Sequence, residues 1–584
     1  MLSVVLLLPL LVAIIAIALG DWRHAKYIAL GSSLVTLALL PFSTGPATVQ
    51  WLSIGGAAFD IVISTQQLNL MLMALVSFMI PFALFYSFGY INLPSAQKRF
   101  YAEMLAFETA MLLFAMSGSF VTLFIAWEFL SMTSYLLIGF WYNREKAVRA
   151  ARKVVSIILF GDIALFASLV LFFAAYGTLD FSQIISEIGS SNALAYAAVS
   201  LLVVAIFTKS AQFPFHEWLA DAMEGPVPVS AMLHSATMVK AGVFAALVLL
   251  PLISAAHLGN FIVAVGLFTA IIATLDALRE KHVKKALAYS TVQELSIMLV
   301  AVGANALLAA VYFFIAQSFY KSMLFFTAGD AMSATGKENV GEVNGLTSNK
   351  LLFLSALFGV LALAGFVPFD GFFANIGVGS AFTSNLIAYA LLSLVSLLTS
   401  FFIFRWLVLC SRPVSEKREA ILYSGLPKSM IIPGLLLALL ALAASALFFF
   451  MPSLFNSLQL VKGKPILINV PDALIETAIV NIGGFAAWLV YRKERENHLL
   501  NRRLNHLQTT RAFNIAYALI ASFFYALAAG FYYFDAYLDS LFNLIAHGVN
   551  ASAKAMRYAA QGQLGTYVAI FIAGFLLVML VLVV

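Results

Sequence analysis

The stretch ALAYAAVSLLVVAIFTKSAQFPFHEWLADAMEGP, residues 193–226, has the composition of a membrane span but is interrupted near its centre. Lys209 follows an apolar run, and an ammonium group at mid-membrane costs about 2.5 to 3.5 kcal/mol, so such a residue rarely serves packing alone. Pro214 interrupts the helix and leaves backbone carbonyls free to hold water or a cation. A lysine beside a broken helix predicts a proton or ion pathway. The alternative is a lysine that extends its charge to the membrane interface.

The composition of the whole chain agrees with a membrane setting. Of its 584 residues, 62% are hydrophobic and 10% are charged, and the mean hydropathy is +0.98. Apolar runs of about 18 residues or more recur from end to end. We therefore expect an all-α polytopic membrane protein. The first run, residues 1–20, lacks a basic start and a small-residue cleavage site, so we expect it to remain as the first span.

The apolar runs predict about sixteen or seventeen spans, two of them broken. They lie near residues 1–19, 26–43, 67–92, 101–118, 120–142, 152–176, 193–222 (broken), 227–253, 258–278, 285–303, 305–333, 350–378 (broken), 382–410, 429–451, 470–491, 512–534 and 564–584. Basic residues cluster in alternate loops, which the positive-inside rule assigns to the cytoplasm, with the N-terminus outside. Alternating polar and apolar residues around Gly55 and Gly56 predict an external β-hairpin within residues 45–65.

Several function classes are not indicated by this sequence. The single cysteine, Cys410, excludes a disulfide framework and a self-contained iron–sulfur cluster. No glycine-rich phosphate loop opens a helix after a strand, so we expect no cofactor in this chain. The net charge of +6 lies in loops, where it acts as a topology signal and requires no nucleic-acid partner.

Two short segments resemble each other and lie at the two expected breaks. PFHEWLA, residues 214–220, and PFDGFFA, residues 368–374, share the proline, the following phenylalanine, an aromatic residue four positions after the proline and the final alanine. Paired interrupted helices in two parts of a chain are typical of repeat-built transporters with ion sites near the bilayer midplane.

Ionisable residues recur within the apolar runs. They are Glu128, Asp162, Lys209, His234, Lys240, Glu294, Lys321 and Asp370. A proton relay needs such groups, because neighbours and burial can shift their proton affinity. His234 and Lys240 are six positions apart and do not share a helix face closely, so a link between them requires water or another span. For Asp162 and Glu294, a static hydrogen-bonded carboxyl is an alternative to a relay role.

Three motifs resemble the antiporter-like subunits of the respiratory complex I superfamily, which includes Mrp-type Na+/H+ antiporters and energy-converting membrane hydrogenases. They are WEFLSMTSYLLIGF (127–140), KSAQFPFHEWLADAMEGPVPVSAMLHSATMVKAGV (209–243) and KKALAYSTVQELSIM (284–298), and the resemblance covers the chain from about residue 50 to residue 410. It implies a bundle with two inverted five-helix repeats, each with a broken helix. By motif match, Glu128 is the glutamate that pairs with the broken-helix lysine, Lys209. His234 is the connecting histidine, and Lys284 and Lys321 are lysines that lead across the second half.

The end of the chain is similar to the L-type branch of this superfamily. FYYFDAYLDS (531–540) followed by QGQLGTYVAIFIAGFLL (561–577) is similar to the end of that branch, which has a lateral amphipathic helix and a final span. The segment between the two motifs is too short for a very long lateral helix, and Lys240 resembles the M-type and Mrp-type pattern instead. The expected parts are N-terminal spans with the hairpin (1–100), a first repeat (101–253), a second repeat (258–411) and C-terminal spans with a possible short lateral helix (412–584).

The second half departs from the pattern of the superfamily. Where a lysine is expected after the second break, this chain has Asn375, which cannot titrate in this range. Gln317 and Phe313 stand where L-type members often carry histidines. The titratable groups that remain there are Asp370, Glu294 and Lys321.

The resemblance implies a proton-translocating membrane-arm subunit of a complex I-like redox pump in the inner or plasma membrane. Its partners are other membrane-arm subunits, a peripheral redox module, the lipid bilayer and H+ or Na+, and the oxidoreductase chemistry lies in other chains. A subunit of a multisubunit Na+/H+ antiporter is the alternative. The missing lysine also fits a structural subunit with impaired conduction.

Overall fold

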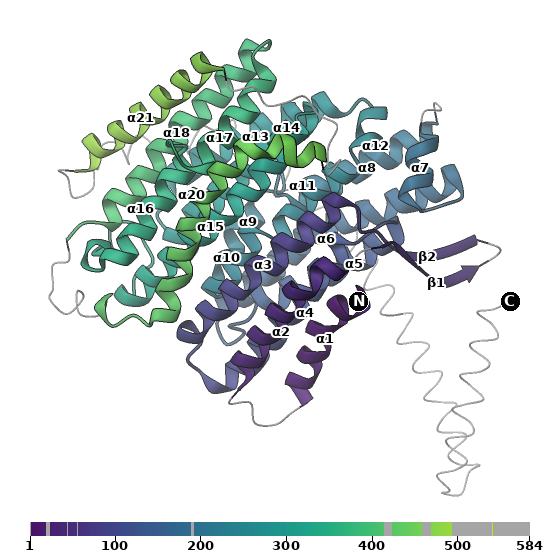
Figure 1. The fold of residues 1–584 in the computed structure, drawn as a ribbon, viewed down its shortest axis with the longest axis horizontal. Coiled ribbons are helices and arrows are strands. Elements are labelled where there is room, and N and C mark those ends of the chain that lie inside the picture. Colours follow the sequence, from purple (N-terminus) through teal and green to yellow (C-terminus); the bar gives the residue numbers. More distant parts are fainter. Residues whose placement is uncertain are drawn as a thin grey trace, which may run out of the picture. The chain divides into compact units, whose positions relative to one another are not determined.

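The structure is a computed structural model. It describes residues 2–18, 24–43, 45–54, 57–188, 192–413, 423–457 and 469–492, together with Ser540. Figure 1 shows a bundle of helices with one two-stranded sheet. Within the described residues, 11 helices are long and apolar enough to cross a membrane, and shorter apolar helices lie at Val4–Ile15, Ala193–Lys209 and Lys350–Ala364. The predicted all-α polytopic membrane architecture is confirmed.

The helices follow the predicted spans closely. The first part contains α1 (Leu2–Ala18), α2 (Ala25–Leu39), α3 (Gln67–Tyr90), α4 (Pro94–Ala115), α5 (Phe120–Ile138), α6 (Glu145–Tyr176), α7 (Phe181–Glu187), α8 (Ala193–Lys209), α9 (Glu217–Asp221), α10 (Val227–Ser235), α11 (Met238–Val248) and α12 (Leu250–Ala255). Then come α13 (Gly259–Arg279), α14 (Val283–Gly303), α15 (Leu307–Thr335), α16 (Lys350–Ala364), α17 (Asp370–Gly379), α18 (Leu386–Cys410), α20 (Lys428–Ser457) and α21 (Val470–Tyr491). The predicted spans at 512–534 and 564–584, and both tail motifs, lie outside the described residues.

The predicted β-hairpin is present. Strands β1 (Ala47–Ile54) and β2 (Ala57–Ile63) pair in antiparallel fashion. Thr122 at the start of α5 ties the hairpin to the bundle, because its Oγ1 accepts a hydrogen bond from the Val62 N–H at 2.9 Å. The Gly118 N–H donates to the Val62 carbonyl at 2.9 Å, which adds a second attachment.

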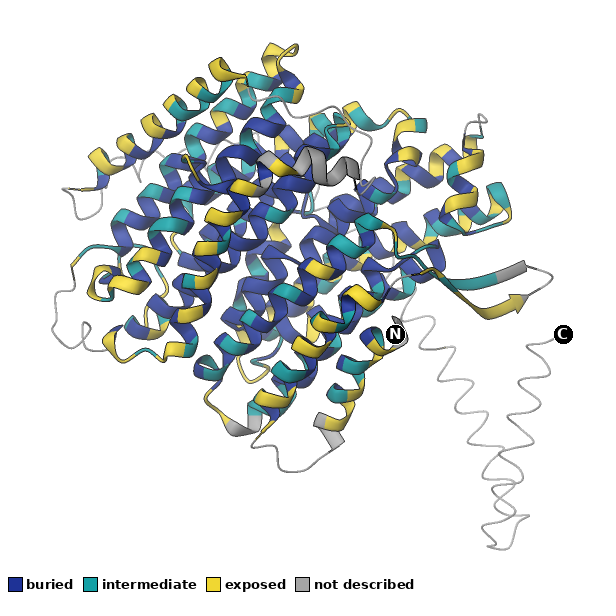
Figure 2. Ribbon diagram, viewed as in Figure 1, coloured by how far each residue is buried: buried dark blue, intermediate teal, exposed yellow. Residues whose placement is uncertain are grey.

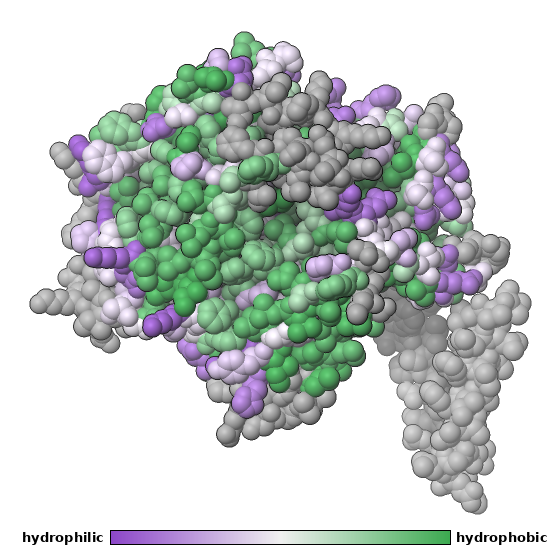
Figure 3. Space-filling model, viewed as in Figure 1, coloured by the Kyte–Doolittle hydropathy of each residue, from purple (hydrophilic) through white to green (hydrophobic). Residues whose placement is uncertain are grey.

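Burial separates the central helices from those at the edge of the bundle. In the apolar part of α15, 89% of the residues are buried, whereas in the apolar part of α21 only 22% are buried (Figure 2). Figure 3 shows a broad hydrophobic surface on the face in view, with hydrophilic side chains mainly at its periphery. Polar groups on the central helices are therefore shielded from lipid and from bulk water, so other parts of the protein must satisfy them.

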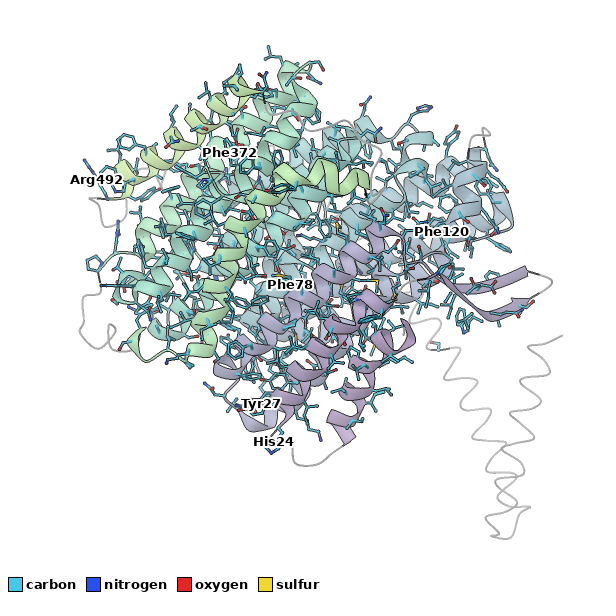
Figure 4. The ribbon with its side chains drawn as sticks, in the orientation of Figure 1. His24, Tyr27, Phe78, Phe120, Phe372 and Arg492 are labelled. Carbon is cyan, nitrogen blue, oxygen red and sulfur yellow. The ribbon has the colours of Figure 1, made fainter. Side chains whose placement is uncertain are left out.

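Helix α3 connects the N-terminal helices to α15. Tyr27 on α2 packs edge-on against Phe88 of α3, with ring centroids 5.4 Å apart. Nearer the start of α3, the ring centroid of Phe78 lies 6.4 Å from that of Phe319 on α15. Tyr27 and Phe78 are labelled in Figure 4. These contacts join the first spans to the longest central helix of the second half.

The two predicted helix breaks are both confirmed. Helix α8 ends at Lys209 and α9 begins at Glu217, and Pro214 lies between them. Helix α16 ends at Ala364 and α17 begins at Asp370. Gly365 adopts a left-handed conformation (φ 82°) at the end of α16, which a residue without a Cβ tolerates best.

A third interruption was not predicted. The span expected over residues 227–253 is divided, because α10 ends at Ser235 and α11 begins at Met238. The Thr237 hydroxyl donates a hydrogen bond to the Met232 carbonyl at 2.6 Å, and threonine hydroxyls can compete in this way with helical backbone bonds. No proline or glycine marks this position in the sequence.

Gly371→Ala should destabilise the protein. A Cβ at position 371 would collide with the carbonyl oxygen of Ala362 in α16, and overpacking of this kind costs about 1 to 3 kcal/mol. Gly379→Ala on the same helix is the matched control, since its Cβ would lie 3.7 Å from the Tyr389 ring, an ordinary contact. The thermal midpoint in detergent should fall for the first variant and stay near that of the unchanged protein for the second. Equal midpoints for the two variants would contradict the close approach.

Candidate functional site

Lys209 forms the first charged centre at the end of α8. Its side chain is 1% exposed, which does not fit a lysine that reaches the membrane interface. The ammonium Nζ lies 3.7 Å from Asp162 Oδ1 on α6 and donates a hydrogen bond to Ser131 Oγ on α5 at 2.5 Å. It also lies 4.8 Å from the centre of the Trp127 ring. The buried charge is therefore balanced by a carboxylate, a hydroxyl and an aromatic face.

Close packing of α6 on α8 brings Asp162 within reach of this lysine. Gly161 faces Thr208, and a Cβ at position 161 would fall 2.6 Å from the Thr208 Cβ. The Asp162 carboxylate is then oriented by Trp127, whose Nε1 donates to Oδ1 at 2.6 Å, and by Ser131, whose hydroxyl lies 3.3 Å from Oδ2. A small residue at position 161 is thus a condition for the ion pair.

The ion-pair partner of Lys209 differs from the predicted one. The motif match assigned this role to Glu128, but the structure pairs Lys209 with Asp162. Trp127 and Ser131 lie four positions apart and share the face of α5 that meets Lys209, whereas Glu128 is rotated by about 100° from Trp127. Glu128 is half-buried and lies within electrostatic range of both Asp162 and Lys209.

A second charged centre joins α14 and α15. Lys321 Nζ lies 2.8 Å from Glu294 Oε2 and donates to Ser290 Oγ at 2.7 Å. Gln317 Nε2 donates to the same carboxylate oxygen at 3.2 Å. Ser290 and Glu294 are four positions apart, as are Gln317 and Lys321, so each pair presents one helix face to the other. The residues that the sequence left as separate candidates form one buried ion pair.

His234 on α10 and Lys240 on α11 lie on either side of the unexpected interruption. Both residues contact α15, a span of the kind that their spacing requires for a link unless water provides it. Gln317 Nε2 donates to the His234 carbonyl at 3.1 Å, while Lys240 Nζ donates to Ser318 Oγ at 2.6 Å and to the Phe314 carbonyl. Since Gln317 also binds the Glu294 carboxylate, it connects the backbone of His234 to the second charged centre.

The His234 ring is fully buried and packs 4.9 Å from the Phe325 ring. Within the described part of the chain, neither ring nitrogen has a hydrogen-bond partner.

Lys284 anchors the segment that follows the first break. Its ammonium donates to the carbonyls of Met223 and Gly225, the latter at 2.9 Å. The adjacent His282 accepts the Lys284 backbone N–H at its Nδ1, 3.1 Å away. Burial, followed by the charges of Lys284 and Lys285, lowers the pKa of His282 to about 3, so this imidazole remains a neutral acceptor at physiological pH. Lys284 connects α14 to the segment after the first break through backbone oxygens.

Asp370 is the first residue of α17 and is fully buried. Its Oδ1 accepts the Gly371 N–H at 3.0 Å, which is a helix-terminal contact of the expected kind. Its Oδ2 has no hydrogen-bond partner in the described ranges. The hydrogen bond at the start of the helix therefore accounts for one carboxylate oxygen only.

Comparisons with known proteins agree with this geometry. Residues 117–402 match the family described as NADH:quinone oxidoreductase/Mrp antiporter, TM. The chain carries the antiporter-like membrane domain of the complex I superfamily.

Two sequence relatives have names that refer to subunits of quinone oxidoreductases. The chain is 32% identical over 378 residues to NAD(P)H-quinone oxidoreductase chain 5 of Synechocystis sp., covering 61% of this chain and 55% of the relative. It is 35% identical over 367 residues to NADH-quinone oxidoreductase subunit L of Campylobacter jejuni, covering 62% of this chain and 61% of the relative. These alignments thus span less than two thirds of either relative.

Two solved structures share the fold. One is the Mrp complex from Dietzia sp. DQ12-45-1b, with a TM-score of 0.77 and 22% identity, covering 100% of this chain and 63% of that one. The other is the membrane-bound sulfane sulfur reductase, an archaeal respiratory membrane complex, with a TM-score of 0.68 and 20% identity, covering 82% and 98%. At this identity the likeness concerns the architecture.

The antiporter-like domain and its neighbouring helices contain two buried carboxyls, Asp330 and Glu108, and one half-buried carboxyl, Glu476, that the sequence analysis did not select. Asp330 accepts a hydrogen bond from the Tyr86 hydroxyl at 2.9 Å, and Glu108 accepts one from Ser33 at 2.9 Å. Glu476 on α21 accepts one from the amide of Asn375 at 3.2 Å. Each carboxyl interrupts an apolar run, and that signal could have identified them. The described residues contain no group of three or more histidine, cysteine or acidic side chains that could hold a metal ion.

Asp162→Asn should destabilise the domain, because it leaves the Lys209 ammonium buried without its carboxylate. Removing one member of a buried pair costs about 3 to 5 kcal/mol. Glu145→Gln is the control, because it breaks an exposed pair with Arg149 that contributes about 1 kcal/mol or less. Thermal midpoints in detergent measure both changes. Adding Lys209→Gln to Asp162→Asn should recover stability, and a double variant no more stable than the single one would contradict the pairing.

Proposed function

We propose that this chain is a proton-translocating membrane-arm subunit of a complex I-like, redox-driven pump. The observation that carries the proposal is the set of buried ionisable groups in the bundle: the Lys209–Asp162 pair, the Lys321–Glu294 pair, and Lys240 and His234, which both contact α15. A bilayer protein rarely keeps several ionisable groups in its interior unless they serve ion movement. The names of the sequence relatives add support.

The two ion pairs act as coupled proton stations, that is, as sites that each take up and release a proton. In each, a lysine on one helix faces a carboxylate on another, so separation of the two helices would remove the stabilising opposite charge. Loss of that charge lowers the proton affinity of the lysine and raises that of the carboxylate. A pair that opens therefore passes a proton to the next station. In this scheme residues 101–253 and 258–411 form two half-channels.

The energy for opening comes from other chains. We propose that neighbouring membrane-arm subunits transmit it from a peripheral redox module, which holds the electron-transfer cofactors. The complex lies in an energy-conserving membrane, and the basic loops favour an N-terminus on the outer side. A multisubunit Na+/H+ antiporter and a structural subunit without conduction are the competing functions, and transport measurements separate all three.

Lys209→Ala should remove most of the proton flux while the complex still assembles. The experiment uses vesicles containing the whole complex, a pH-sensitive dye and the electron donor of the host membrane. Lys153→Ala is the matched control, because Lys153 lies near the same break but is half exposed and pairs with Asp221 at 2.7 Å. Its flux should remain near that of the unchanged complex.

The outcomes distinguish the three functions. Flux that depends on electron transfer and disappears with Lys209→Ala supports the redox pump. Proton movement that follows a Na+ pulse without electron transfer supports an antiporter instead. Unchanged flux in Lys209→Ala, in a complex shown by co-purification to contain the variant, supports a structural subunit.

Substitutions at His234 test the connection between the two halves. His234→Phe preserves a ring beside Phe325 but cannot bind a proton, so it should reduce flux strongly if titration matters. His234→Lys keeps a titratable nitrogen and should retain part of the flux. If the phenylalanine variant transports normally, the histidine serves packing only.

A further inference from the structure

A cavity lies beside the second break, between α17, α18 and α21. The cavity offers about 30 Å³ of space for water-sized molecules and is partly open to the surroundings. Its polar lining comes chiefly from Asn375, Tyr389, Ser396, Asp472 and Glu476. Two of these residues are carboxylates, and no basic side chain lies among the described residues that line the cavity.

Asn375 is held firmly between the break and α21. Its amide Nδ2 donates to Glu476 Oε1 at 3.2 Å. On its other side, the same nitrogen packs against Gly365 at the end of α16. A Cβ added at position 365 would lie only 2.8 Å from it. Ser396 also hydrogen-bonds to the Glu476 carboxylate. The carboxylate therefore has fixed partners directly beside the break.

A second carboxylate, that of Asp472, lines the same cavity. Asp472 lies four positions before Glu476, so the two side chains are neighbours along α21. The Tyr389 hydroxyl donates to Asp472 Oδ1 at 3.3 Å.

We propose that Glu476 is the proton station of the second break and performs the task that the superfamily pattern gives to a lysine at position 375. The proposal rests on the proposed function. The proposal places the station on α21, which lies outside the family match at 117–402. It also replaces a basic side chain by an acidic one at this point of the pathway. Asn375 positions the carboxylate through its amide and does not itself titrate.

The first test measures proton flux in vesicles that contain the whole complex. Glu476→Gln keeps a hydrogen-bonding side chain of the same length but cannot titrate, so we expect it to lose most of the flux. Glu476→Asp should keep part of it. Glu145→Gln, whose carboxylate is 81% exposed on α6, is the control and should transport normally. Introducing Asn375→Lys into the Glu476→Gln variant should restore part of the flux, because the lysine supplies a titratable group at the same place.

Comparison with Lys209→Ala separates failure of this inference from failure of the proposed function. If Glu476→Gln transports normally while Lys209→Ala does not, the complex pumps protons but Glu476 is not a station. If both transport normally, the proposed function also fails. Co-purification of each variant with its partner subunits excludes loss of assembly as the cause.

A second readout detects the protonated carboxyl directly. A hydrophobic carbodiimide adds to a protonated carboxyl in an apolar site and leaves a stable N-acylurea on it, which mass spectrometry of the α21 peptide can locate. We expect labelling at Glu476 in the unchanged complex, together with loss of flux. An unlabelled Glu476 would overturn the proposal. Protection by Na+ at constant pH would also overturn it, because the site would then bind a metal cation.

Discussion

The cost of a charge in the hydrocarbon layer determines how the centre of this bundle is built. Without bulk water, each buried ammonium and carboxylate must find its partners within the protein. Lys209 and Lys321 solve this problem in the same way, with a carboxylate from a second helix and a serine hydroxyl close to the nitrogen. Lys240 uses a hydroxyl and a backbone carbonyl. The helices that carry these residues must therefore remain in contact.

Small residues make these contacts possible. Gly161 lets α6 approach Thr208, and Gly242 lets α11 approach the carbonyl of Ile206, where an added Cβ would lie only 2.6 Å away. These close approaches surround the end of α8, where Lys209 lies. Packing in a membrane gains little from the hydrophobic effect, so short distances between helix backbones contribute a larger share of the stability. The electrostatic centre and the steric fit are thus two aspects of one arrangement.

The sequence was sufficient for features that depend on local chemistry. Apolar runs gave the positions of the spans, and Pro214 and Pro368 gave the two breaks, because proline acts on its own helix. The interruption at Thr237 escaped prediction because it depends on a side-chain hydrogen bond that many threonines do not form in helices. The exchange of Asp162 for Glu128 as the partner of Lys209 could not be foreseen either. Sequence spacing within α5 and α6 does not reveal how the two helices are rotated about their axes.

Tertiary packing also explains why the second break was harder to interpret than the first. The backbone of that break is produced by Pro368, the left-handed Gly365 and the close approach of Gly371 to α16, and none of these features requires a lysine. The side chain at position 375 can therefore differ in charge without loss of the break. Its partner, Glu476, is 101 positions away in the sequence, so only the fold brings the two together. The backbone of the break and the charge beside it are consequently set by different residues, and one can change while the other is kept.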